Sequence, residues 1–238
     1  MISMVISDAV RSLDRDLRSI FGDRLRSLVT YRDAGATVQA PTPTLAVVDA
    51  LTVDDLRACA DRMDAWHEAG LATPLMLRPQ EFGRSLDAFP YEFGAILADY
   101  AVVSGENLFA GLRVNPADLR RACEIQVRGH LLHLREGYME TRGRSDAVAE
   151  LVTRSIPPLV ALLKSIARLQ DADTLDAFGA AALVERIIGV SSESTACFSE
   201  LLMLSTKGPL SADTARRLYP EYLDTLERLT IYIDRWTT

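Results

Sequence analysis

The stretch that most constrains the fold is residues 25–49, where two short apolar and β-branched runs stand close together. The first run, 25–31, reads Leu-Arg-Ser-Leu-Val-Thr-Tyr, and the second, 44–49, reads Thr-Leu-Ala-Val-Val-Asp. The connector between them is made mainly of Gly, Ala, Pro and Thr, which interrupt regular structure. Runs of this length, bounded by turn residues, predict two β-strands.

Helix and strand patterns alternate on both sides of these two runs. Thr52 is placed to cap a helix, and Pro79 stands at the first position of another. The other predicted elements are a helix over 3–21, a helix over 52–69, a strand over 73–77, a helix from 79 to about 87 and a strand over 94–103. This alternation predicts an α/β (α+β) domain with a small mixed sheet.

From Asn115 onward, the sequence carries helical patterns only, which predicts an all-α helical bundle. Pro157 and Pro158 are expected to kink or split one of its helices. The predicted helices run from Asn115 to Gly143, from Ser145 to Leu169, from Thr174 to Ile188, from Ser192 to Ser205 and from Pro220 to Arg235. We therefore predict two domains, residues 1–114 and residues 115–238.

The composition narrows the classes of function. A net charge of −7 and a pI near 5.1 disfavour a general binder of nucleic acid or of anionic membranes. Cys59, Cys123 and Cys197 are isolated and form no Cys-x-x-Cys pair, as expected for reduced thiols of a cytoplasmic protein. No apolar run approaches the roughly 20 residues of a membrane span, and the N-terminus lacks the basic region of a signal peptide.

The 25–49 stretch resembles the core of the polymerase-β-type nucleotidyltransferase superfamily. In that family, strand one ends in a Gly-Ser turn that approaches a triphosphate, and strand two carries two carboxylates that hold Mg²⁺. Here the turn positions are Arg32 and Asp33, and the carboxylate positions are Thr42 and Thr44. The later helices resemble the bundle that follows the catalytic domain in many of these enzymes, including those that modify aminoglycosides.

The resemblance implies a degenerate member of the superfamily. A neutral hydroxyl is a poor primary ligand for Mg²⁺, so we expect that metal-dependent transfer is lost and that neither Mg²⁺ nor NTP is a cofactor. The expected role is ligand binding, regulation or assembly, with a small-molecule or protein partner or as a homo-oligomer. The first alternative is an active enzyme, using Mg²⁺ and NTP, whose metal site is rebuilt from Asp33, Asp49, Glu92 or Asp99.

Glu124, Arg128 and Arg135 share one face of the helix predicted after Asn115. They are either cleft residues, with the arginines binding an anion, or a common Glu–Arg pair on a solvated surface. We favour the surface pair.

His130 and His133 stand three residues apart, a spacing that can share a metal, but no third ligand is near them. We interpret both as structural. Arg128 and His133 also match the Arg-x4-His pattern of HEPN-type ribonucleases, which gives a second alternative, a bundle-based ribonuclease. The leucines around His133 predict its partial burial, which counts against acid–base chemistry.

Overall fold

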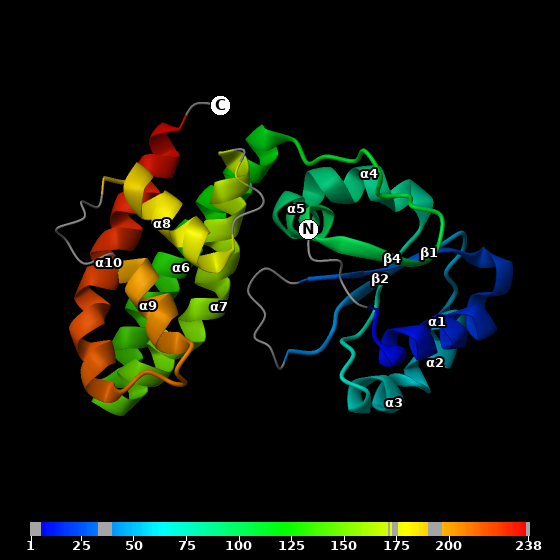
Figure 1. Ribbon diagram of the computed structural model, residues 1–238, viewed down its shortest axis with the longest axis horizontal. Helices are drawn as coiled ribbons and strands as arrows, with labels where there is room; N and C mark the ends of the chain where they lie inside the picture. The colour runs from blue at the N-terminus through cyan, green and yellow to red at the C-terminus, as the bar shows by residue number, and fades with distance from the viewer. Residues whose placement is uncertain (1–5, 33–39, 171, 173–175, 190–196, 237–238) are drawn as a thin grey trace. The chain divides into compact units, whose positions relative to one another are not determined.

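The computed structural model describes residues 6–32, 40–170, 172, 176–189 and 197–236. The chain divides into two compact units, Met1–Asn115 and Pro116–Thr238, and each is described by itself. Figure 1 shows the elements of both units.

The first unit is built on a four-stranded sheet in the order β3-β2-β1-β4. Strand β1 (Leu25–Tyr31) pairs antiparallel with both β2 (Thr44–Val48) and β4 (Tyr100–Gly105). Strand β3 (Leu75–Leu77) pairs in parallel with β2. The sheet is therefore mixed, and the two runs that opened the sequence analysis form its centre.

Helices cover both faces of this sheet (Figure 1). Alternate residues of β1 and β2 point to opposite faces, so each strand contributes to two cores. Leu28 and Ala46 belong to a core with helices α1 (Asp8–Phe21), α2 (Val53–Ala60) and α3 (Met63–Glu68). Val29 and Leu45 belong to a second core with α4 (Pro79–Ala88) and α5 (Pro90–Ala98).

Side-chain caps fix where helices α1 and α2 begin. The Ser7 side chain accepts a hydrogen bond from the N–H of Val10, at the start of α1. Thr52 and Asp55 form a reciprocal capping box at the start of α2, as the position of Thr52 predicted. The single helix predicted over 52–69 is wrong, because the chain makes a turn at residues 61–62 between α2 and α3.

The strand predicted over 94–103 is also wrong in its first half. Residues 90–98 form helix α5, and the strand is limited to Tyr100–Gly105. Pro90 supplies the first helical residue, and Phe93, Gly94 and Ile96 are buried. An apolar run of this length fits a buried helix as well as a strand, so its composition alone does not distinguish the two.

Strand β4 ends at a glycine that no other residue could replace without strain. Gly105 has φ +80°, and a Cβ built there would lie 2.1 Å from the carbonyl oxygen of Arg26. The backbone of β1 therefore approaches this turn too closely for any side chain.

The second unit is helical throughout its described part. Its described helices are α6 (Pro116–Thr141), α7 (Ser145–Leu169), α8 (Ala177–Ile187), α9 (Cys197–Ser205) and α10 (Ala212–Arg235). The long helices α6, α7 and α10 pack on one another, and apolar residues at three- and four-residue spacing fill the space between them. None of the described helices has the length and apolarity that a membrane crossing requires.

One prediction based on proline is wrong in this unit, and another is limited to a kink without a split. Helix α10 begins at Ala212 with Ser211 as its cap, so Pro220 lies inside the helix and does not open it. Helix α7 continues through Pro157 and Pro158 without a break. The predicted helix starts at Thr174 and Ser192 lie outside the described residues.

Candidate functional site

Arg32 and Asp99 form an ion pair at the end of β1, where the resemblance places the phosphate-binding turn. Nε of Arg32 lies 3.2 Å from Oδ2 of Asp99, and both side chains are about half exposed. The backbone N–H of Arg32 also donates to the carbonyl of Asp99 over 3.0 Å. Asp99 thus faces a guanidinium instead of an open metal site. Asp33 lies outside the described residues.

Thr44 is a core residue. It pairs with Thr30 across β1 and β2, its exposed fraction is 0%, and its Oγ1 has no hydrogen-bond partner among the described residues. Thr30 Oγ1, by contrast, donates to the carbonyl of Pro43 over 3.1 Å. Thr42 is half-buried and forms an isolated bridge with Leu71. One of the two positions matched to family carboxylates is therefore closed to solvent.

The remaining carboxylates do not gather around Asp99. Asp49 follows the last residue of β2, where its carboxylate lies 3.4 Å from Nη1 of Arg26, near the start of β1. Glu92 lies in the first turn of α5 and is exposed. In the described part of the chain, no three His, Cys, Asp or Glu side chains come together to hold a metal ion. The described residues thus offer no rebuilt metal site.

A two-pronged ion pair between Arg24 and Asp55 in this unit was not predicted from the sequence. Two guanidinium nitrogens of Arg24 each lie 2.8 Å from an oxygen of Asp55, whose carboxylate also accepts from the backbone and hydroxyl of Thr52. The hydrogen bonds from Arg24 hold the pKa of Asp55 well below its ordinary value, and those from Thr52 add to the effect. The Thr52-x-x-Asp55 spacing is typical of a capping box. No local pattern indicates that Arg24 pairs with Asp55.

Arg128 and Arg135 join α6 to α10. Arg128 forms an ion pair with Asp234, and Arg135 lies 2.5 Å from Glu227. The two arginines are seven residues apart on α6, and their two acidic partners are seven residues apart on α10. The two pairs therefore follow one another along antiparallel helices. Arg128 also pairs with Glu124 at 3.4 Å, as the surface-pair interpretation predicted. The anion-binding role of these arginines stays untested, but both already have carboxylate partners.

The two histidines of α6 differ in surroundings. His130 Nε2 lies 2.6 Å from the hydroxyl of buried Tyr222, and Ser155 Oγ lies 3.1 Å from the same hydroxyl. Burial, with a smaller contribution from nearby His133, lowers the pKa of His130 to about 4. The predicted partial burial of His133 is wrong, because 83% of its side chain is exposed.

The ribonuclease alternative needs Arg128 and His133 to act together. Five residues of α-helix separate them, which corresponds to about 140° around the helix axis. Arg128 faces α10, whereas His133 is exposed and its Nδ1 lies 3.4 Å from Oε2 of Glu136. Nothing in this arrangement brings the two side chains to one substrate.

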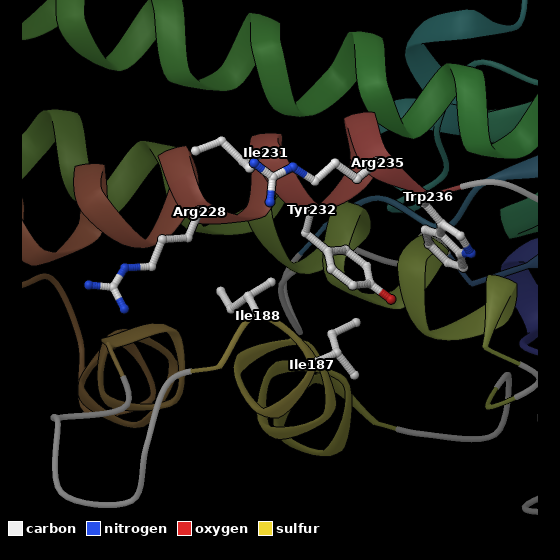
Figure 2. Close-up of a pocket in the computed structure, with 7 residues that line it drawn as sticks. All are labelled: Ile187, Ile188, Arg228, Ile231, Tyr232, Arg235 and Trp236. Carbon is white, nitrogen blue, oxygen red and sulfur yellow. The ribbon is translucent and has the colours of Figure 1, made fainter.

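A pocket of about 470 Å³ lies in the helical unit, and none of its residues was singled out in the sequence. Figure 2 shows α10 on one side of it and the end of α8 on the other. Arg228 extends to the end away from Trp236, and the guanidinium of Arg235 lies between the two, beside Ile231. The signal in the sequence was the three- and four-residue spacing of these α10 side chains. The lining residues are Ile187, Ile188, Arg228, Ile231, Tyr232, Arg235 and Trp236.

No protein-family model matches the sequence, and no curated protein matches it. Among solved structures, the chain is similar to spectinomycin adenyltransferase AAD(9) from Enterococcus faecialis, solved with ATP and spectinomycin. The match covers 96% of this chain and 99% of that chain, with a TM-score of 0.57 and 10% sequence identity. The chain has a nucleotidyltransferase-like fold. The predicted fold class, an α/β domain with a small mixed sheet followed by a helical bundle, is confirmed.

Proposed function

We propose that this chain is a nucleotidyltransferase-fold protein that has lost metal-dependent nucleotidyl transfer and acts in ligand binding, regulation or assembly. The observation that carries the proposal is the burial of Thr44, at a position where the family has a metal-binding carboxylate. Mg²⁺ in two-metal sites requires charged oxygens that face the nucleotide, and a buried neutral hydroxyl is not one. The ion pair between Arg32 and Asp99 supports the same proposal.

An exposed face of α6 supports a role in assembly as a homo-oligomer. Ile125, Leu132 and Met139 recur every seven residues and expose 64%, 55% and 69% of their surfaces. Seven residues bring a helix back to nearly the same face, so the three side chains form one apolar stripe. Gly129 lies beside the stripe, and a Cβ built there would meet nothing within 4 Å, which leaves room for a close partner.

Cysteine cross-linking tests this assembly. In a two-fold pair of α6 faces, Leu132 at the centre of the stripe meets its own copy, so Leu132→Cys should give a disulfide-linked dimer under mild oxidation. The native cysteines are buried and should contribute little background. Arg154→Cys, on the exposed surface of α7, is the matched control. Equal cross-linking of the two variants, or none from Leu132→Cys, would argue against the assembly role.

We also propose a cytoplasmic location. Cys59, Cys123 and Cys197 are all buried free thiols, which is the usual state of cysteine in a reducing compartment.

The second candidate is an active nucleotidyltransferase, and the likeness to AAD(9) over nearly the whole chain favours it. The positions of Asp49 and Asp99 count against it, because these carboxylates belong to different ends of the sheet. The proposed loss of activity is thus the function that the geometry supports best.

A transfer assay separates the two candidates. The full chain is incubated with labelled ATP, Mg²⁺ and spectinomycin, and AAD(9) is assayed in parallel as the positive control. We expect no labelled product from this chain. Mg²⁺-dependent transfer that is lost in Asp99→Asn and kept in Asp54→Asn, an exposed control carboxylate, would establish the active enzyme instead.

A further inference from the structure

The pocket between α8 and α10 is lined by apolar and aromatic side chains and by two arginines. Ile187 and Ile188 of the α8 terminus face Tyr232 and Trp236 of the α10 terminus across it (Figure 2). Its volume of about 470 Å³ falls within the roughly 300–1,000 Å³ usual for small-molecule sites. An apolar or aromatic group would therefore find both space and partners here.

The helix geometry of α10 explains how this lining arises. Residues 228, 231, 232, 235 and 236 are spaced by three, four, seven and eight positions, so they share one face of the helix. The rings of Tyr232 and Trp236 contact each other with centroids 5.6 Å apart. The Tyr232 hydroxyl lies 3.5 Å from Nε2 of Gln170, which helps to hold the aromatic wall in place.

The two arginines give the pocket its polarity. Arg228 is paired with Asp224 at 2.8 Å, but Arg235 has no ion-pair partner among the described residues. In Figure 2 the guanidinium of Arg228 lies at the end away from Trp236, and that of Arg235 lies between them, beside Ile231. A guanidinium binds carboxylates through parallel N–H donors, so Arg235 is the group available for an anion.

We propose that this pocket binds a small organic anion in which a carboxylate is attached to an acyl or aryl body. The apolar body lies between the isoleucines and the aromatic side chains, and the carboxylate accepts hydrogen bonds from Arg235, with Arg228 adding positive charge. A neutral molecule of the same shape would leave Arg235 without its acceptor and would bind more weakly. This site lies within the helical unit, so the proposal does not depend on whether the α/β unit transfers nucleotides.

Tryptophan fluorescence of the full chain tests the proposal, with phenylbutyrate as the anionic probe and phenylbutanol as its neutral counterpart. Trp236 lines the pocket, whereas Trp66 is buried in the α/β unit, so Trp66→Phe removes the background signal. We expect saturable quenching by phenylbutyrate and binding of phenylbutanol that is about tenfold weaker or more.

Variants of the arginines make the test specific. Arg235→Ala should weaken phenylbutyrate binding about tenfold, and Arg235→Lys should keep part of the affinity. Arg216→Ala, an exposed arginine of the same helix, is the matched control and should leave binding unchanged. Circular dichroism confirms that each variant is folded. Absent quenching, equal binding of the alcohol, or equal effects of Arg216→Ala and Arg235→Ala would each overturn the proposal.

Discussion

Asp49 and Asp99 lie next to opposite ends of strand β1. The backbone N–H of Asp49 donates to the carbonyl of Arg24, before the strand begins, and Asp99 accepts from the backbone N–H of Arg32, after it ends. Seven residues of strand span about 20 Å, whereas two catalytic metal ions lie only about 3.5–4 Å apart. These two carboxylates therefore cannot share one metal centre while the sheet is intact.

The cross-strand threonines should respond oppositely to loss of their hydroxyls. Thr44→Val removes a buried hydroxyl without a partner among the described residues, so the free energy of unfolding should stay unchanged or rise by up to about 1 kcal/mol. Thr30→Val loses a hydrogen bond to Pro43 and should lower it by about 1 kcal/mol. Thr44→Asp should lower it by about 3 kcal/mol or more, because the charge is buried without a partner. Urea denaturation measures all three, and a well-tolerated Thr44→Asp would show that the position is open to solvent.

The Arg24–Asp55 pair should stabilise the α/β unit. Asp55→Asn should lower the free energy of unfolding by about 1–3 kcal/mol, because it removes charge-assisted hydrogen bonds to a largely buried carboxylate. Asp54→Asn, at the neighbouring exposed pair, should change it by less than about 0.5 kcal/mol.

The depressed pKa of Asp55 sets the pH window of this pair. The unfolded chain takes up the proton first, so the stabilisation is present above about pH 4 and is lost as the pH falls further. Denaturation curves at neutral and acid pH measure how much of the free energy of unfolding is lost on acidification. Equal losses of this free energy in Asp54→Asn and Asp55→Asn at neutral pH would contradict the stabilising role of the pair.

His130 should make the helical unit sensitive to mild acid. Its pKa of about 4 lies below the ordinary 6.5, so the unfolded chain binds the proton first as the pH falls. The stabilisation is present above about pH 6.5 and is lost toward pH 4, by up to about 3 kcal/mol in the free energy of unfolding. His130→Gln should remove this part of the pH dependence, and His133→Gln, at an exposed site, should keep it. A full pH dependence in His130→Gln would show that other groups cause it.

Gly105 should not tolerate a side chain. Gly105→Ala should lower the free energy of unfolding by about 2 kcal/mol or more, because φ is +80° and the new Cβ meets the Arg26 carbonyl. Gly83→Ala, in helix α4 with nothing within 4 Å of a Cβ, should raise it by about 0.5–1 kcal/mol. Thermal denaturation compares the two, and a stabilised Gly105→Ala would contradict the close approach of the chains.

Local patterns predicted the centre of the fold because they act within a few residues. The alternation of Leu28 and Val29 between two cores, and the cap at Thr52, are both visible in sequence. The start of α10 was missed because Pro220 is a common first helical residue, while the decisive cap, Ser211, lies well before it. Tertiary packing keeps the turn around Pro220 helical, which no local signal could indicate.

The candidate site was predictable only in part, because its contacts depend on pairing between distant strands. The pairing of Arg32 with Asp99 requires the register of β4 on β1, which the sequence does not reveal. The burial of Thr44 requires helices on both faces of the sheet. His130 and His133 were both interpreted as structural, because only the direction of the bundle core distinguishes the partly buried His130 from the exposed His133.

Titration calorimetry of the full chain with ATP, with and without Mg²⁺, tests the central claim most directly. Thr44 supplies no carboxylate, and the carboxylate of Asp99 is already paired with Arg32. We therefore expect any ATP binding to be weak and to be equal with and without Mg²⁺. Asp99→Asn and Asp49→Asn should leave that result unchanged. Tight ATP binding that requires Mg²⁺ and disappears in either variant would show that the chain keeps a working metal site.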